Sequence, residues 1–160
     1  MISINVEKGV AKETQLISDL AYYCVEKLMP RKRNLEVDIL QVKNLEDKEG
    51  DLASCVDTDN INTFEIKLDK DMSLRKKLLS VTHEMVHVKQ FTRKELEHTS
   101  STNRQLWRGK KYNTKNRYYD LPWEIEAYGK ELGLFNGWVA DNNIKGKFTK
   151  DPTWRQISYK

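Results

Sequence analysis

Residues 83–87 read His-Glu-Met-Val-His, and their types and spacing could support metal-dependent hydrolysis. On a helix, His83 and His87 lie one turn apart on the same face, so both imidazoles can bind one metal ion. Zinc suits such a site because it accepts neutral imidazole nitrogens. We expect Glu84 to act as the catalytic base: its carboxylate accepts a proton from a metal-bound water that attacks a carbonyl, then passes it to the leaving amine.

The surrounding pattern argues against a solvated helix face that merely carries two histidines. An apolar stripe runs along the expected helix, and the histidines lie roughly opposite it, flanked by further apolar residues. A helix that is apolar on more than one side is buried between layers, as a helix under an active site must be. The stripe consists of Leu74, Leu78, Val81, Met85 and Val88, and the flanking residues are Leu79, Val86 and Phe91.

A catalytic zinc usually takes three protein ligands and one water, so a third ligand is needed. His98 is the remaining histidine among the 3 in the chain. On a continuous helix it lies about 16 Å beyond His87, so it could bind the same metal only if the helix ended between Gln90 and Lys94. We therefore expect the third ligand to come from elsewhere.

Two glutamates near the start of a later expected helix are better candidates for the third ligand. Glu124 and Glu126 point about 200° apart on a helix, so only one of them can face the metal. Ala127 shares a face with Glu124 and is small enough to let this helix approach the histidine helix. The alternative is that both glutamates merely complement the helix dipole.

The two motifs together resemble the gluzincin group of zinc metallopeptidases. The likeness is greatest to small bacterial and phage-type proteins in which HE-x-VH is followed by a PWEIEAY-like segment, and it covers about residues 60–132. It implies one zinc ion per chain, a protein or peptide substrate and hydrolysis of peptide bonds. It also implies that Glu124, three residues before an alanine, is the third ligand. Many gluzincins follow that alanine with Asp or Asn, whereas this chain has Tyr128.

The resemblance further implies a zincin-like α+β fold. Such a fold has an N-terminal helix, a small mixed sheet of three or four strands, a central metal-binding helix and a C-terminal helix with the third ligand. An edge strand beside the cleft would bind the substrate backbone, and chain order suggests residues 62–68 for this role. Periodicity agrees with this order, predicting strands over residues 2–6, 35–39, 52–57 and 64–68 and helices over 12–29, 74–96 and 123–134. We expect Ser73 to cap the second helix and Asn136-Gly137 to end the third.

The composition is typical of one globular domain spanning residues 1–160, in which residues from about 141 form a loosely packed tail. The chain is 38% hydrophobic and 32% charged, and no apolar run approaches the roughly 20 residues that span a bilayer. No secretory signal is visible at the start, so we expect a cytoplasmic protein with no membrane partner. Cys24 and Cys55 are far apart and form no CxxC pair, so we expect neither a disulfide framework nor a thiolate metal site.

Residues 104–119 contain six cationic residues, one Trp and three Tyr. Such a segment can bind nucleic acid, which is possible here but not favoured, or it can line the cleft, or it can be a solvated loop. We expect a hairpin around residues 106–112. A tyrosine of this segment, or Tyr128, could donate a hydrogen bond to the developing oxyanion.

Two other functions remain alternatives at this point. One is a nucleic-acid-associated protease similar to SprT-like enzymes, although those normally use a third histidine. The other is a non-catalytic protein that binds a metal for stability, in which Glu84 would have no required role.

Overall fold

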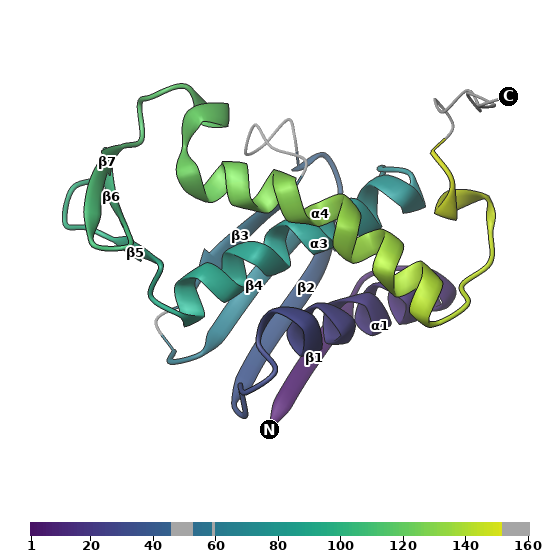
Figure 1. The fold of residues 1–160 in the computed structure, drawn as a ribbon. Coiled ribbons are helices and arrows are strands. Elements are labelled where there is room, and N and C mark those ends of the chain that lie inside the picture. The colour runs from purple at the N-terminus through teal and green to yellow at the C-terminus, as the bar shows by residue number, and fades with distance from the viewer. Residues whose placement is uncertain (46–52, 59, 152–160) are drawn as a thin grey trace, which may run out of the picture.

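The structure of the chain is a computed structural model that describes residues 1–45, 53–58 and 60–151. Within these residues it contains three α-helices, a four-stranded sheet and a separate three-stranded sheet (Figure 1). The α+β class predicted from the sequence is therefore confirmed. None of the described helices is long and apolar enough to cross a membrane.

The four-stranded sheet is mixed, with the strand order β1-β2-β4-β3. β1 (Ile2–Glu7), β2 (Leu35–Val42) and β4 (Thr63–Asp69) run parallel, and β3 (Ala53–Asp57) pairs antiparallel with β4. All four predicted strands are present, although residue 52 lies outside the described residues. The alternating apolar side chains of the two central strands are buried in the core: Leu35, Val37, Ile39, Phe64, Ile66 and Leu68.

The prediction that residues 62–68 form the edge strand beside the cleft is wrong. β4 is paired on both sides, with β2 and with β3. β3 occupies the edge instead, because the chain turns back after it and forms an antiparallel pair with β4. In the described part of the chain no further strand pairs with β3 on its outer side.

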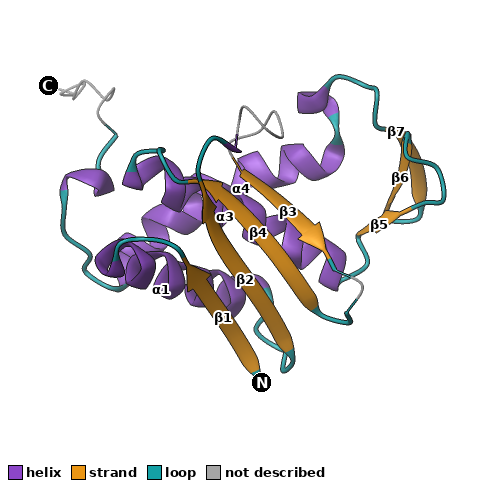
Figure 2. Cartoon of the chain, turned by 180° about the vertical axis from the view of Figure 1, so that it is seen from behind, coloured by secondary structure: helices purple, strands orange, loops and turns teal. Residues whose placement is uncertain are grey.

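Three helices lie on one side of this sheet: α1 (Ala11–Leu28), α3 (Leu74–Thr92) and α4 (Pro122–Asp141) (Figures 1 and 2). α3 lies between the sheet and α4, which explains why its sequence is apolar on more than one side. The hydroxyl of Ser73 accepts a hydrogen bond from the backbone N–H of Lys76 at 3.4 Å, so the predicted cap is present.

α3 ends at Thr92 rather than near residue 96 as predicted. Lys94 adopts a left-handed conformation with φ 54°, and the backbone N–H of Glu95 then donates to the carbonyl of Gln90 at 2.8 Å. This turn satisfies the carbonyls at the helix end and directs the chain into β5.

The second sheet consists of β5 (Leu96–His98), β6 (Arg104–Trp107) and β7 (Lys110–Asn113), all antiparallel. Arg108 and Gly109 both have positive φ, as a two-residue hairpin turn requires, so the predicted hairpin is confirmed. A small apolar cluster anchors this sheet to the start of α4, and it consists of Leu96, Trp107, Leu121 and Trp123.

α4 continues through Asn136-Gly137 to Asp141, so the prediction that this pair ends the helix is wrong. A Cβ on Gly137 would lie 2.7 Å from the hydroxyl oxygen of Tyr23, so glycine serves close packing between α4 and α1. Phe135 and Trp138 are fully buried on either side of it. Their burial outweighs the weak helix propensity of glycine.

The chain beyond α4 returns to the main core. Ile144 and Phe148 pack against the core cluster, and Arg75 donates to the backbone carbonyl of Phe148 at 3.0 Å. Residues 152–160 of the expected tail lie outside the described residues.

Candidate metal centre

Two histidines of α3 and one glutamate of α4 meet where the two helices pack together. The Nε2 atoms of His83 and His87 are 3.2 Å apart. Oε2 of Glu124 lies 3.2 Å from Nε2 of His83, and its Oε1 lies 3.5 Å from Nε2 of His87. All three residues are buried, and one possible ligand atom from each lies within 4.8 Å of the others.

These separations fit a single divalent cation. Around a tetrahedral metal with bonds of about 2.0–2.1 Å, neighbouring ligand atoms are about 3.3 Å apart. The measured distances of 3.2, 3.2 and 3.5 Å are close to that value. Two imidazole nitrogens and one carboxylate oxygen could therefore hold one metal ion and leave a fourth position free.

The far side of the His83 ring is held by Glu131. Nδ1 of His83 lies 2.9 Å from Oε2 of Glu131, and an ionised carboxylate can only accept a hydrogen bond. Nδ1 therefore carries the hydrogen. This tautomer leaves the lone pair of the neutral ring on Nε2, which faces His87 and Glu124.

Gln90 fixes the tautomer of His87 in the same way. Its amide nitrogen donates to the backbone carbonyl of Trp123 and to Oε2 of Glu126, both at 2.9 Å. The amide oxygen is therefore the atom that faces Nδ1 of His87 at 2.8 Å, and Nδ1 must donate to it. Both histidines thus present Nε2 to the site, each fixed by a partner behind the ring, as metal-binding histidines usually are.

Of the two candidate glutamates, the structure brings Glu124 into the cluster and leaves Glu126 outside it. Glu126 accepts a hydrogen bond from Lys89 at 2.7 Å in addition to the one from Gln90. Lys89 is 5% exposed and also pairs with Glu95 at the start of the second sheet. Glu126 therefore neutralises a buried lysine and supports Gln90 from behind.

The charges of the cluster are strongly coupled. Burial disfavours the charged form of His83, but hydrogen bonds with Glu124 and Glu131 outweigh it and raise the pKa of His83 to about 9. Burial opposes charge on His87 as well, yet Glu124 raises its pKa. Burial alone would raise the pKa of Glu124, whereas its hydrogen bonds with the two histidines lower it to about 2. The site therefore attracts positive charge, either protons or a cation.

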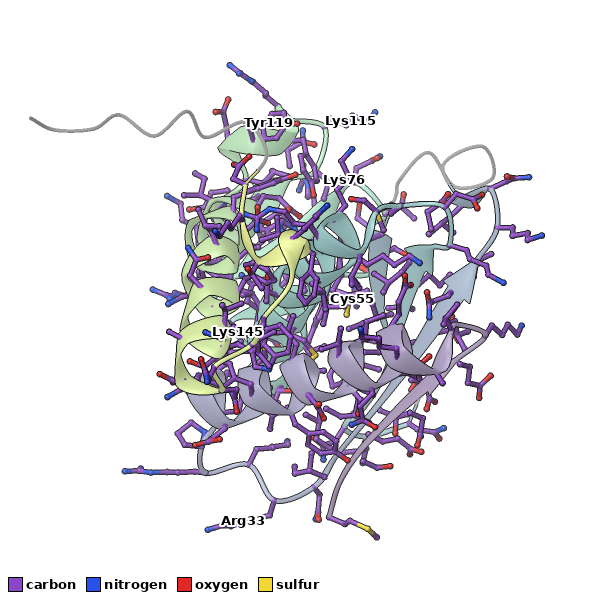
Figure 3. The ribbon with its side chains drawn as sticks, turned by 90° about the vertical axis from the view of Figure 1, so that its right-hand side faces the viewer. Arg33, Cys55, Lys76, Lys115, Tyr119 and Lys145 are labelled. Atoms are coloured by element: carbon purple, nitrogen blue, oxygen red, sulfur yellow. The ribbon has the colours of Figure 1, made fainter. Side chains whose placement is uncertain are left out.

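Glu84 is buried and lines a pocket of about 240 Å³ beside the cluster, together with His87 and Glu124. The opposite wall is the edge strand β3, through Ala53, Ser54 and Cys55. Burial, with the nearby negative charge of Glu84, raises the pKa of Cys55 well above its usual value. Figure 3 labels Cys55, which is half-buried on this edge strand. Glu84 therefore shares one pocket with two residues of the cluster and with the edge strand β3.

His98 is not a member of the cluster, although α3 does end within the range that could have allowed it. It lies on β5, is exposed, and stacks on Phe91 with ring centroids 5.0 Å apart. It lines the same pocket at a distance from the ligand atoms, as part of the wall formed by the second sheet.

Two of the candidate tyrosines lie beside the cluster. The hydroxyl of Tyr118 is hydrogen-bonded to Glu124, and burial, followed by this bond, raises the pKa of Tyr118, so it stays protonated. The ring of Tyr128 lies 4.5 Å from that of His83. Tyr112 instead packs on Trp123, with centroids 6.1 Å apart.

The sequence reasoning missed Glu131 and Gln90, although both carried a signal. Glu131 follows Glu124 by two helical turns and so lies on the same face of α4, and Gln90 follows His87 by about one turn. Such spacings are common on any helix. The signal becomes specific only when the ligand positions are already known.

Comparisons with models of protein families, with curated proteins and with solved structures gave no match for this chain.

Proposed function

We propose that this chain is a zinc-dependent metallopeptidase that hydrolyses peptide bonds in a protein or peptide substrate. The observation that carries the proposal is the buried His83–His87–Glu124 cluster, with donor atoms at the spacing of a tetrahedral metal site. A purely structural metal site would need no acidic residue beside it. Glu84 lines the same pocket as His87, Glu124 and the edge strand β3.

Zinc is the metal that best suits two neutral imidazoles and one carboxylate. His83, His87 and Glu124 would hold it through Nε2, Nε2 and a carboxylate oxygen. When bound, it would lower the pKa of water and polarise a substrate carbonyl. The hydrogen bonds from Glu131 and Gln90 fix the orientation of both rings in advance.

Residues of the protein itself would carry out the remaining steps. The carboxylate of Glu84 accepts the proton of the attacking water and returns it to the leaving amine. The hydroxyl of Tyr118, which bonds to Glu124 in the metal-free site, would turn its hydrogen to the oxyanion that develops on the carbonyl, and its raised pKa keeps that hydrogen in place. The substrate backbone lies in extended form along β3, whose outer edge can pair with an added strand.

The order of elements also agrees with the gluzincin resemblance. The first helix follows β1 and precedes the other three strands of a mixed sheet, a second helix bears both histidines, and a third bears the glutamate. The edge strand next to the metal-binding helix is antiparallel to its neighbour β4. This arrangement supports a zincin-like fold, in which that strand lines the substrate cleft.

Elemental analysis of the purified chain together with the Glu84→Gln variant tests the proposal. We expect about one zinc per chain in both proteins, and hydrolysis of fluorescently labelled unfolded casein by the wild type alone. Loss of the base should lower the rate at least about 100-fold. Zinc in both proteins without casein hydrolysis by either would favour a non-catalytic metal-binding protein. Equal hydrolysis by both would exclude Glu84 as the base.

A further inference from the structure

The segment that contains β6 and β7 carries a concentrated positive charge that the metal site does not use. Residues 98–119 contain six lysines and arginines and no aspartate or glutamate. All six are exposed, and we call them the basic hairpin surface: Arg104, Arg108, Lys110, Lys111, Lys115 and Arg117.

The charge is segregated along the chain. The whole sequence has 28 basic and 24 acidic residues, so the part outside residues 98–119 has 22 basic against 24 acidic residues. The net positive charge of the protein therefore originates in this one segment. The segment also contains exposed hydroxyl and amide side chains, including Ser101, Asn103 and Asn116, and these too can donate hydrogen bonds to anionic oxygens.

The cations are presented by a fixed framework. The apolar cluster of Leu96, Trp107, Leu121 and Trp123 anchors the three strands, which project from the main body beside the N-terminal end of α4 (Figure 1). Arg108 lies over the ring of Trp107 at 5.0 Å, and Lys110 lies over Tyr112 at 5.6 Å. Such stacking keeps the charged groups oriented at little entropic cost.

The basic hairpin surface adjoins the candidate active site. His98, Gln105 and Tyr118 belong to the same segment and line the pocket that contains Glu84. Figure 3 shows Lys115 and Tyr119 at the same end of the molecule, where this segment leads into α4. A polypeptide that lies in the pocket can therefore extend onto the cations without a change of fold.

The aromatic rings favour a polypeptide over a nucleic acid. Base stacking requires free ring faces. Trp107 is only 9% exposed, and its ring and that of Tyr112 lie 6.5 and 6.1 Å from that of Trp123. The two rings of the hairpin itself, Trp107 and Tyr112, are thus occupied within the protein, which leaves charge as the main means of recognition there. Tyr118 and Tyr119, nearer to α4, are 47% and 60% exposed but contact each other and Tyr128.

We propose that the basic hairpin surface binds an acidic segment of the protein substrate next to the scissile bond. This inference rests on the proposed peptidase function and names its substrate class. Exposed cations contribute individually weak contacts, so selectivity arises from several acting together and falls as salt rises.

The test measures binding to the zinc-loaded Glu84→Gln protein, so that no cleavage occurs. The probes are a fluorescein-labelled unstructured peptide rich in glutamate, its glutamine counterpart, and single-stranded oligothymidylate of equal charge. A triple variant replaces Arg104, Lys111 and Lys115 with Gln. A matched control replaces Lys12, Lys145 and Lys147, exposed lysines outside the segment, and loses the same charge.

We expect the hairpin variant to bind the glutamate peptide about tenfold more weakly at low salt, and the control to bind it nearly as the parent does. The glutamine peptide should bind weakly to all three proteins. Equal losses in both triple variants, or equal binding of the glutamine peptide, would overturn the proposal. So would tighter binding of oligothymidylate through the same three residues, which would assign the surface to nucleic acid.

Failure of this inference is distinguishable from failure of the proposed function. Zinc content and casein hydrolysis by the wild type report on the peptidase alone. Peptide binding reports on the basic hairpin surface, whether or not the protein hydrolyses a substrate. If the wild type hydrolyses casein but shows no preference for acidic peptides, only the proposed substrate class is contradicted.

Discussion

Glu131 accepts the Nδ1 hydrogen of His83 at 2.9 Å, two helical turns after the glutamate that faces the other side of the same ring. The imidazole is therefore held between two carboxylates of α4, with Nε2 directed to Glu124. The ring of Tyr128 lies beside that of His83 in an edge-to-face arrangement, with centroids 4.5 Å apart.

Replacement of Glu131 by Ala should weaken zinc binding about 10- to 100-fold, because the His83 ring loses its fixed orientation. The zinc affinity of Glu131→Gln should fall between those of the wild type and Glu131→Ala, since the amide oxygen can still accept the hydrogen bond. Competition with a chromophoric chelator measures the affinity. Glu26→Gln, at an exposed position on α1, serves as the control and should bind zinc as the wild type does. Unchanged affinity in Glu131→Ala would show that the ring is oriented by packing alone.

Gln90→Leu should weaken zinc binding to a similar degree and should also destabilise the metal-free protein. Gln90 is fully buried and bonds to His87, Trp123 and Glu126, so its loss leaves buried polar atoms without partners, at a cost of about 1–3 kcal/mol each. Denaturant unfolding in the presence of a chelator measures the stability. Gln15→Leu, on an exposed face of α1, should change the free energy of unfolding little. A stable Gln90→Leu protein with normal zinc affinity would contradict the assigned role.

Glu124→Ala and Glu126→Ala should have opposite effects on metal content and stability. Glu124 supplies a ligand atom, so its removal should abolish stoichiometric zinc binding. Glu126 neutralises Lys89, whose side chain is 6% exposed, so its removal should cost about 1–3 kcal/mol of stability and leave the zinc in place. Elemental analysis and denaturant unfolding of both variants provide the comparison. Zinc loss in Glu126→Ala alone would reverse the ligand assignment.

Zinc uptake should release protons at neutral pH. The pKa of His83 is raised to about 9 in the metal-free site, so zinc must displace a proton there, whereas Glu124, with a pKa of about 2, has none to release. Calorimetric titration at pH 7.5 in two buffers of different ionisation enthalpy should give at least about one proton per zinc, because the pKa of His87 is raised as well. Zinc affinity should rise with pH up to about 9. A heat of binding that is independent of the buffer would contradict this account.

The same raised pKa predicts the pH dependence of the metal-free fold. Protonated His83 contributes stability below its unfolded pKa of about 6.5, and this contribution is lost as pH rises through about 9. The free energy of unfolding of the metal-free protein should therefore fall between pH 6.5 and 9.5. His83→Ala, which lacks the group, should show a smaller decline over this range.

Several parts of the fold followed from local pattern alone. Alternation of apolar residues predicted the strands, and Ser73 predicted the start of α3, because both depend on neighbouring residues. The errors occurred where distant residues intervene. Gly137 continues a helix because Tyr23 lies against it, and β4 is internal because β3 folds back onto it.

The sequence by itself determined that His83 and His87 lie on one face of a helix with Glu84 beside them, because helical geometry fixes neighbours three and four residues apart. It could not choose between Glu124 and Glu126, or find Glu131 and Gln90 behind the rings. Those choices depend on how α4 packs on α3, which places one glutamate at the histidines and the other at Lys89. Contacts between distant segments are set by the packing of the whole core, and only the tertiary structure decides them.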